Sequence, residues 1–231
     1  MPKVDFGTTD ILSQVAGIGP NVLEQLNSGT YPGIHYRVHN ISDIKKSDYS
    51  KLPLEAYLTI THTAGRQYDR AEVEKVAKLA QSKLKIKATI TGSYRRGLAK
   101  LNDVDLLTTS DKHAIPEDDD IKIIRNGDTQ MKLLVRLPGP GHRSPYMTSE
   151  HEYVPTDVLI TSPERHAFAL LHFTGSKEFN QRIRAHAKAK GFAKLNQYGL
   201  YTKTGPVPGL NTEKKIFKKL GMEYLEPKDR N

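Results

Sequence analysis

The sequence of 231 residues contains no cysteine, no tryptophan and no long hydrophobic run. The lack of cysteine excludes disulfide bonds, thiolate zinc sites and a cysteine nucleophile, while histidine and carboxylate metal sites remain open. No apolar run approaches the roughly 20 residues that cross a bilayer, and the amino terminus lacks the apolar segment of a secretion signal. We therefore expect a soluble intracellular protein of the nucleus or cytoplasm that is not secreted and does not bind membranes.

Positive charge is concentrated in the last third of the chain. The formal net charge is +9, and residues 164–231 contain 14 Lys and Arg but six Asp and Glu, an excess of eight. Charge gathered in this way is typical of a surface that binds phosphates, although a solvated basic face is the alternative. Nucleic acid is the expected partner.

The spacing of apolar residues predicts an α+β chain. Residues 8–26 read as a helix, a Gly-Ile-Gly-Pro hairpin and a second helix, the second beginning at Pro20 or Asn21. A long amphipathic helix is expected to begin near Asp69, and residues 86–163 alternate in the manner of strands. Helical spacing then returns and ends in a small strand pair and a last helix. The acidic run EDDD within the strand region is expected to be a solvated turn, because no apolar strand holds its carboxylates together.

Two aspartates stand at the start of an apolar run in GSYRRGLAKLNDVDLL, residues 92–107. Side chains two residues apart in a strand point to the same face, so Asp103 and Asp105 are expected to aim the same way. Asp157 lies in another apolar strand, and paired strands bring facing side chains to about 5 Å. Three carboxylates this close stay ionised only beside cations, and oxygen ligands suit Mg²⁺. A lone Asp-x-Asp is more often turn chemistry, so the interpretation depends on its neighbours.

Donors for phosphate oxygens precede these aspartates. Gly92 allows close approach of the backbone to a ligand, and Ser93 with its amide can hold a phosphate at the start of a short helix. Arg95 and Arg96 carry guanidinium groups that bind phosphate oxygens in pairs. Metal-binding carboxylates beside triphosphate donors predict a nucleotide-transfer site.

In these motifs the chain resembles the nucleotidyltransferase superfamily and, within it, the DNA polymerase X family. GSYRRG followed by DVD and a third strand aspartate carries the first likeness, and HFTGSKEFNQRIRAHAKAKGF with the ending EYLEPKDRN carries the second. KLNQYGL and HFTG are also similar to small viral members. The resemblance runs from about residue 10 to the end. It implies a mixed β-sheet palm of the nucleotidyltransferase type at 69–163, helix-hairpin-helix fingers at 1–68 and a small α+β nucleotide-selecting subdomain at 164–231.

The resemblance also implies a role for each site residue. The catalytic and metal-binding set is Asp103, Asp105 and Asp157, which would bind two Mg²⁺ or Mn²⁺ ions, with Asp157 accepting the proton of the primer 3'-hydroxyl. The residues implied to bind the nucleotide are Gly92, Ser93, Arg96, His172, Phe173, Gly175, Lys177 and Asn180. Those implied to bind DNA are Gly17, Gly19, Arg184 and Lys188. Backbone carbonyls of the hairpin would bind Na⁺ or K⁺, namely those of Ser13, Val15 and Ile18. Arg95 is expected to be structural or to pair with a core carboxylate.

Spacing in the helix after Gly175 agrees with a nucleotide-selecting role. One stripe of the helix is polar and recurs every four residues, at Asn180, Arg184 and Lys188. The neighbouring stripe is apolar, at Phe179, Ile183 and Ala187. One face is therefore expected to pack and the other to meet the nascent base pair. A solvated basic helix is the alternative.

Several positions depart from the family pattern. His172 stands where tyrosine is usual, so we expect it to tune sugar discrimination and nucleotide affinity. Pro155 replaces an arginine before the third aspartate, and Lys177 replaces an acidic residue. Because the hairpin begins by residue 11, the amino-terminal lyase domain of some members is not expected, nor is its activity.

The predicted activity is addition of a dNMP to a primer 3'-end on a gapped duplex, with gap filling in base-excision repair as its task and a monomer as its form. DNA and dNTP are the expected partners. One alternative is a template-independent nucleotidyltransferase, terminal or RNA-end adding. The other is a DNA-binding module without catalysis.

Overall fold

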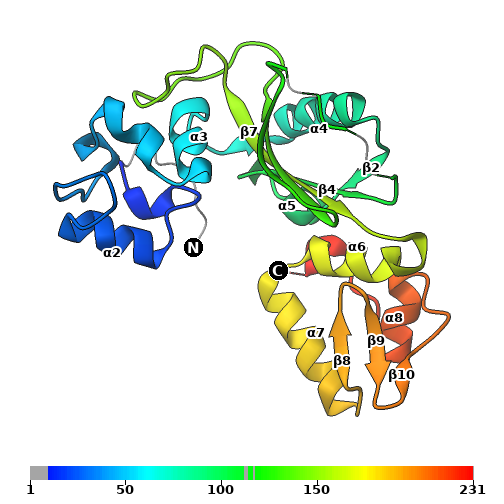
Figure 1. Cartoon of the computed structure of the whole chain (residues 1–231). Coiled ribbons are helices and arrows are strands. Elements are labelled where there is room, and N and C mark those ends of the chain that lie inside the picture. Colours follow the sequence, from blue (N-terminus) through cyan, green and yellow to red (C-terminus); the bar gives the residue numbers. More distant parts are fainter. Residues whose placement is uncertain (1–9, 112–113, 117, 231) are drawn as a thin grey trace.

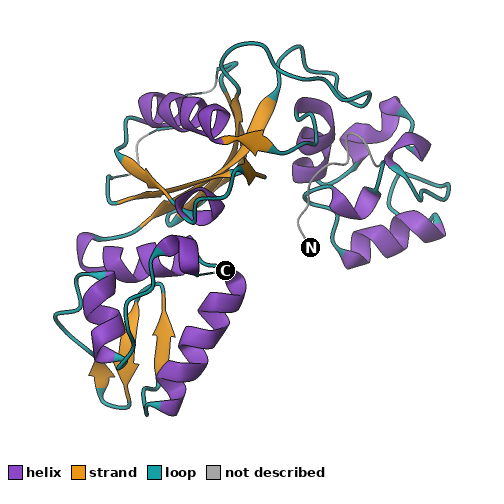
Figure 2. Ribbon diagram, turned by 180° about the vertical axis from the view of Figure 1, so that it is seen from behind, coloured by secondary structure: helices purple, strands orange, loops and turns teal. Residues whose placement is uncertain are grey.

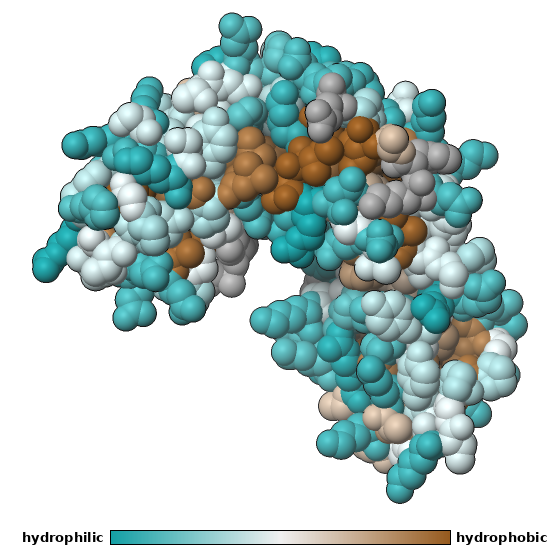
Figure 3. All heavy atoms as spheres, viewed as in Figure 1, coloured by the Kyte–Doolittle hydropathy of each residue, from teal (hydrophilic) through white to brown (hydrophobic). Residues whose placement is uncertain are grey.

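The amino acids from 10 to 230 form a crescent with a sheet at its middle and an arm at each end (Figure 1). A computed structural model describes residues 10–111, 114–116 and 118–230. Each of the three parts has its own hydrophobic cluster. The space-filling view shows that the two arms stand apart and leave the inner side of the crescent open (Figure 3). The predicted α+β class is confirmed.

The amino-terminal arm is helical. Its elements are η1 (Leu12–Gln14), α2 (Pro20–Ser28), η2 (Ile41–Asp43), η3 (Lys46–Lys51) and α3 (Leu54–His62). Helix α2 begins at Pro20, which is one of the two residues at which it was expected to begin. It ends before Gly29, which adopts the left-handed conformation. The first predicted helix is wrong, because only the three-residue η1 forms there. The few residues before the glycine turn at Gly17 are too short for cooperative helix formation.

The central sheet has the strand order β2-β4-β7-β6-β5, and only β4 and β7 run parallel. The strands are β2 (Ala88–Ile90), β4 (Val104–Thr108), β5 (Ile121–Asn126), β6 (Gln130–Arg136) and β7 (Tyr153–Ile160). A separate two-stranded pair joins β1 (Tyr68–Asp69) to β3 (Lys100–Leu101). The long helix α4 (Arg70–Leu84) begins where expected, with Asp69 as its cap.

Helix α4 covers one face of the sheet, and the opposite face remains partly open. Val73, Val76 and Ala80 of α4 share a cluster with Leu106 and Val158 of the central strands. Because side chains alternate along a strand, the neighbouring positions point the other way. Helix α6 (His166–Thr174) covers that second face through Ala169, which clusters with Leu107 and Leu159. Leu58 of α3 packs on the same face, in a cluster with Leu134 and Tyr153.

The carboxy-terminal arm consists of three helices around a small sheet (Figure 2). Its elements after α6 are α7 (Lys177–Ala189), β8 (Lys194–Asn196), β9 (Gly199–Thr202), β10 (Gly205–Pro206), α8 (Glu213–Lys219) and η5 (Pro227–Asp229), with η4 (Pro163–Arg165) before α6. The sheet has three strands, where a pair was expected. Helix α7 lies along the inner side of the crescent and α8 along the outer side (Figures 1 and 2). Within the described ranges, every helix is too short or too polar to cross a membrane.

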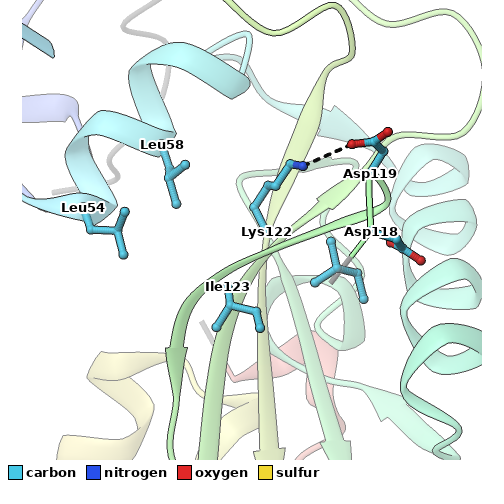
Figure 4. A pocket seen from close by; sticks show the side chains of 7 residues that line it. Leu54, Leu58, Asp118, Asp119, Lys122 and Ile123 are labelled. Atoms are coloured by element: carbon cyan, nitrogen blue, oxygen red, sulfur yellow. Dashed lines mark hydrogen bonds and ion pairs between the residues drawn. The ribbon is translucent and has the colours of Figure 1, made fainter. Parts of the chain in front are cut away.

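A hollow lies between α3 and the outer strand β5 (Figure 4). It is lined by Leu54, Leu58, Asp118, Asp119, Ile121, Lys122 and Ile123. The described part of the acidic run borders it. Lys83 binds Asp118 at 2.5 Å and Asp120 at 2.6 Å, whereas the side chain of Asp119 is 96% exposed. The exposure of Asp119 agrees with the expected solvated turn, although Asp119 also pairs with Lys122 at 3.4 Å. Lys83 holds the neighbouring Asp118 and Asp120 in shorter ion pairs, and Glu117 lies outside the described residues.

Candidate nucleotide-transfer site

Two of the three predicted aspartates face each other on the open side of the sheet. Asp105 of β4 stands opposite Asp157 of β7 in the parallel register. Asp103 is not in the same strand as Asp105, because β4 begins at Val104 and residues 102–103 form a bend. The expectation that one strand holds both residues is therefore wrong, but both line the same cavity, which agrees with the expectation that they aim the same way. The charges of Asp103 and Asp157 nevertheless act on Asp105, so the three carboxylates belong to one site.

Position 92 requires glycine because the side chain of Asp105 lies against its backbone. Its φ is +57°, and a Cβ built there would overlap Oδ2 of Asp105. The backbone of Asp105 also accepts a hydrogen bond of 2.8 Å from the Thr91 amide. Gly92 was expected to allow a ligand close to its backbone, but the group that lies close to it in this structure is the carboxylate of Asp105. Helix α5 (Gly92–Arg95) and β4 are thereby held against each other.

The three carboxylates are difficult to ionise together. Burial, together with the charge of Asp157, raises the pKa of Asp103 to about 6. Burial, followed by the charges of Asp103 and Asp157, raises the pKa of Asp105 well above its usual value. Burial likewise raises the pKa of Asp157, although the nearby Lys132 acts against it. A positive charge brought to this site would remove the mutual repulsion.

The chemistry of this donor set fits hard divalent cations. Oδ1 of Asp157 is buried and has no hydrogen-bond partner among the described residues, which is costly unless another group satisfies it. All the donors are carboxylate oxygens, the ligands that Mg²⁺ prefers. As the side chains stand, however, the described residues include no group of three or more His, Cys, Asp or Glu arranged to hold a metal ion. The two-metal site therefore stays a prediction.

A cavity of about 560 Å³ contains all eight residues expected to bind the nucleotide. Its lining is Gly92, Ser93, Arg96, Asn102, Asp103, Asp105, His172, Phe173, Gly175, Ser176, Lys177, Asn180, Gln181 and Arg184. The expected site residues thus come together from the sheet and from the carboxy-terminal arm. Asn102, Ser176 and Gln181 were not predicted, although each adjoins a predicted residue in sequence. The remaining DNA-binding candidate of α7, Lys188, is exposed one turn beyond this lining.

A second cavity of about 390 Å³ lies between the sheet and the amino-terminal arm. It is lined by Ala16, Glu55, Thr59, Asn102, Asp103, Ile124, Lys132, Leu134, Pro155, Thr156 and Asp157. Asp103 lines both cavities, whereas Asp105 lines the first and Asp157 the second. The three carboxylates therefore lie between two cavities that are lined by different residues.

Lys132 supplies positive charge on the second side. It stands opposite Asp157 in the β6–β7 register, and its Nζ lies 2.7 Å from Oε1 of Glu55 in α3. Pro155 leaves the position two residues before Asp157 without charge. Burial raises the pKa of Asp157, and Lys132 of the neighbouring strand opposes that rise without cancelling it. No motif in the sequence points to Lys132. Its role follows only from strand register.

His172 is held by two residues of α7. The Nη2 atom of Arg184 lies 3.0 Å from Nδ1 of His172, and Nδ2 of Asn180 donates to the backbone carbonyl of His172 at 2.7 Å. The rings of His172 and Phe173 meet edge to face with centroids 4.9 Å apart. Burial, with the charge of Arg184, lowers the pKa of His172. The imidazole is therefore neutral at pH 7, and Nε2 carries the proton because Nδ1 accepts from Arg184.

The predicted stripes of α7 are confirmed by burial. The apolar stripe is buried, at Phe179, Ile183 and Ala187. Asn180 is half-buried, and Arg184 and Lys188 are exposed. Asn180 and Arg184 of this polar stripe line the first cavity, and α7 itself lies along the inner side of the crescent (Figure 1).

The two arginines after Ser93 have different partners. Arg95 binds Glu213 of α8 through two hydrogen bonds, of 2.8 and 3.1 Å, so the expected pairing with a core carboxylate is confirmed. The fully buried Arg230 binds the same Glu213 at 2.6 Å, and its carbonyl accepts a hydrogen bond from the Ser176 amide. Arg96 instead lines the first cavity and donates to the Thr174 carbonyl at 2.6 Å.

Of the two hairpin glycines, Gly17 and Gly19, packing requires glycine only at position 17. A Cβ at Gly17 would lie 2.7 Å from the Ala56 amide nitrogen, whereas Gly19 has open space around it and caps α2. Gly17 is thus required by packing on α3, and Gly19 leaves the start of α2 accessible. The candidate cation carbonyls are those of Ser13, Val15 and Ile18; the carbonyl of Val15 already accepts a hydrogen bond from Ile18. The DNA and cation roles of this hairpin stay predictions.

Comparison with known proteins agrees with this geometry. Residues 73–140 match the model of the nucleotidyltransferase domain, and residues 169–231 match that of the DNA polymerase beta thumb. The chain is 31% identical over 193 residues to DNA polymerase lambda of Rattus norvegicus, covering 71% of this chain and 32% of that protein. It is 28% identical to DNA nucleotidylexotransferase of Xenopus laevis, covering 84% of this chain and 46% of that protein.

A viral relative is covered over most of its own length. Repair DNA polymerase X of African swine fever virus (isolate Tick/Malawi/Lil 20-1/1983) is 35% identical over 145 residues, which are 60% of this chain and 78% of that protein. The chain spans only about a third of the rat polymerase and less than half of the frog enzyme. The matched residues include Asp103 and Asp105 in the first domain model and His172 to Arg184 in the second. The chain therefore belongs to the DNA polymerase X family.

Proposed function

We propose that this chain is a DNA-directed DNA polymerase that adds a dNMP to a primer 3'-hydroxyl and fills gaps in base-excision repair. The observation that carries the proposal is the position of Asp103 between two cavities. One is lined by the expected nucleotide-binding residues, and the other contains Asp157. A volume of about 560 Å³ lies within the usual range for small-molecule sites. The dNTP would occupy the first cavity and the primer end the second.

The reaction requires a proton acceptor near the primer. Attack of the 3'-oxygen on the α-phosphorus forms one P–O bond and breaks the bond to pyrophosphate. Asp157 faces the second cavity and would take the 3'-hydroxyl proton. Such general-base help contributes about 10²–10⁴ in rate. Two Mg²⁺ or Mn²⁺ ions, when held by Asp103, Asp105 and Asp157, would neutralise the charge on the attacking and leaving oxygens.

Residues of the first cavity would bind and orient the nucleotide. Arg96 and the amide region of Ser93 face the space where the triphosphate would lie, and Nε2–H of His172 is a further donor. Phe173 would form the wall beneath the deoxyribose. Asn180 and Arg184 would touch the minor-groove edges of the nascent pair, whose acceptors are shared by all correct pairs. Selection would then depend on the shape of the pair.

DNA would lie along the inner side of the crescent. We divide the chain into hairpin fingers at 1–68, a palm at 69–163 and a nucleotide-selecting subdomain at 164–231, a division supported by the three hydrophobic clusters. The hairpin with Gly17 and Gly19 would bind a DNA phosphate and a Na⁺ or K⁺ ion. Lys188 would bind a phosphate near the nascent pair.

Template-independent addition is the second candidate. The similarity to a DNA nucleotidylexotransferase over most of this chain favours it. The stripe formed by Asn180 and Arg184 favours templated addition, because these side chains would test a base pair.

Extension of a primer on a one-nucleotide gap with each dNTP in turn tests the proposal. We expect one product, set by the template base, and a loss of at least about 10³ in rate when Asp157 is replaced by Asn. Addition of all four dNTPs regardless of template would establish the second candidate. No addition by the unchanged protein would leave only DNA binding.

A further inference from the structure

The outer face of α8 carries four lysines, Lys214, Lys215, Lys218 and Lys219, which we call the α8 basic face. All four side chains are exposed, while Ile216 and Phe217 between them are buried in the arm. Lys214 and Lys218 are one turn apart, and so are Lys215 and Lys219. Two parallel rows of ammonium groups therefore project from this face, each with a spacing of roughly 5–6 Å between Cβ atoms.

These charges are not balanced within the protein. Among the described residues, no carboxylate lies within ion-pairing distance of any of the four lysines. The only acidic residue of α8, Glu213, is buried and bound by Arg95 and Arg230. Two of the four lysines contact neutral groups. Nζ of Lys214 lies 5.5 Å from the ring centroid of Tyr224, and Nζ of Lys215 donates a hydrogen bond to Oδ1 of Asn211 at 2.9 Å. Exposed acids of the following segment, including Glu223, make no ion pair with this face.

The arrangement is unfavourable for the helix itself. Like charges four residues apart repel each other. Lys214 and Lys215 also lie in the first turn, where the helix dipole disfavours positive charge. The two lysines of the last turn agree with the dipole, but those of the first turn oppose it. An external anion would remove both penalties.

The α8 basic face points away from the candidate nucleotide-transfer site. Helix α7 lies along the inner side of the crescent, and α8 lies on the opposite side of the same arm in both views (Figures 1 and 2). None of the four lysines lines either cavity of the site. Phosphates bound in the inner space therefore cannot neutralise them.

We propose that the α8 basic face is a second DNA-binding surface, which binds phosphates of a duplex arm after that arm has left the inner side of the crescent. Four exposed ammonium groups on one face are complementary in charge to the regularly repeated phosphates of a DNA strand. The contact is independent of sequence because phosphates carry no base information. This inference rests on the proposed function for its choice of DNA as the polyanion. It adds a contact that would bend gapped DNA around the carboxy-terminal arm.

The test compares the full chain with the variant K214Q/K215Q/K218Q/K219Q by fluorescence anisotropy on gapped DNA between about 50 and 200 mM salt. The matched control, K75Q/K78Q/K85Q/K87Q, removes four exposed lysines near the long helix and the sheet. Each substrate is used with arms of about 20 base pairs and again with arms trimmed to a few base pairs. Circular dichroism and thermal unfolding show whether each variant is folded.

Each phosphate contact contributes about −0.9 to the slope of log K against log salt. We expect the α8 variant to lose two to four such contacts on long arms and none on trimmed arms. The control should keep the slope of the unchanged protein on long arms. Shortening one arm at a time should identify the arm that is bound.

Equal slopes for the α8 variant and the unchanged protein on long arms would overturn the inference. An equal loss on long and trimmed DNA would also overturn it, because the lysines would then act inside the crescent. Incorporation on trimmed DNA should be unchanged in the variant. If no substrate is extended but the slope still falls on long arms, the proposed polymerase function fails and the DNA-binding face remains.

Discussion

The guanidinium of Arg184 lies 3.0 Å from Nδ1 of His172, on the wall of the cavity proposed for the nucleotide. Arginine can only donate, so Nδ1 must accept and the imidazole must be neutral for this bond to exist. Burial, with the charge of Arg184, lowers the pKa of His172 accordingly. A single pair thus fixes the tautomer of the histidine and leaves Nε2–H directed to another acceptor.

The pairing predicts how His172 titrates. Because its folded pKa is below the usual histidine value of 6.5, the bond to Arg184 is present above pH 6.5 and is lost as the pH falls through the lowered pKa. Proton–nitrogen NMR of the imidazole should show a pKa below 6.5 and a proton on Nε2. Arg184→Gln should raise this pKa in part, since burial remains, whereas Lys188→Gln one turn further should leave it unchanged. An unshifted pKa in the Arg184 variant would contradict the pairing.

Replacement of His172 should alter nucleotide selection. His172→Ala removes the Nε2–H donor and the edge-to-face contact with Phe173. We expect dNTP binding to weaken about 3- to 15-fold, the equivalent of one hydrogen bond, and the dNTP/rNTP ratio to change. His172→Tyr should change the ratio as well. Binding and ratio that both remain unaltered in these two variants would contradict the assigned role.

Gly92 should not tolerate a side chain. In Gly92→Ala the new Cβ would overlap Oδ2 of Asp105, so the carboxylate must move from its place in the site. Incorporation on a one-nucleotide gap should fall by about 10² or more, because small displacements of reacting groups are costly. Gly97→Ala is the matched control, since Gly97 has φ +85° and open space around it. Both variants carry the strain of positive φ, about 1–2 kcal/mol, but only the first should lose activity.

Short motifs, with the family resemblance that they carry, were sufficient to predict which residues line the first cavity. Glycine, arginine and aspartate are constrained there by close approach and charge, and all eight predicted nucleotide-binding residues line one space. The sequence could not show that Asp103 stands outside β4, because a bend and a strand share the same apolar flanks. The alternation of apolar and polar residues alone does not show at which residue a strand begins.

Residues that act through distant partners were not predictable. Lys132 is one of many lysines, and only strand register places it opposite Asp157. Arg230 and Glu213 are 17 residues apart, and only the folded arm buries them together with Arg95 of the sheet region. The sequence shows how many charged residues the chain has, whereas tertiary structure decides which of them form ion pairs.

Glu213 should be important for stability. Glu213→Gln would leave the fully buried Arg230 and the bound Arg95 without their shared carboxylate, which typically costs about 3–5 kcal/mol. Despite burial, hydrogen bonds from Arg95 and Arg230 lower the pKa of Glu213. The stabilisation by Glu213 is therefore complete above the usual glutamate pKa of 4.5 and is lost as the pH falls through the lowered pKa. Urea unfolding should show this loss, and the exposed Glu223→Gln should unfold as the unchanged protein does.

The aspartates of the proposed metal site should destabilise the protein when no cation is present. Their pKa values are raised by burial and by mutual repulsion, so in metal-free buffer stability should fall as the pH rises from about 4 through the pKa of about 6 of Asp103. Asp105→Asn removes one of the repelling charges. We expect it to raise the Tm in EDTA at pH 7 and to abolish incorporation, whereas the exposed Asp119→Asn should change neither. Millimolar Mg²⁺ should raise the Tm of the unchanged protein and have little effect on the Asp105 variant. A Tm that Mg²⁺ leaves unchanged in both, or an Asp105 variant less stable than the unchanged protein in EDTA, would show that these carboxylates are already satisfied within the chain.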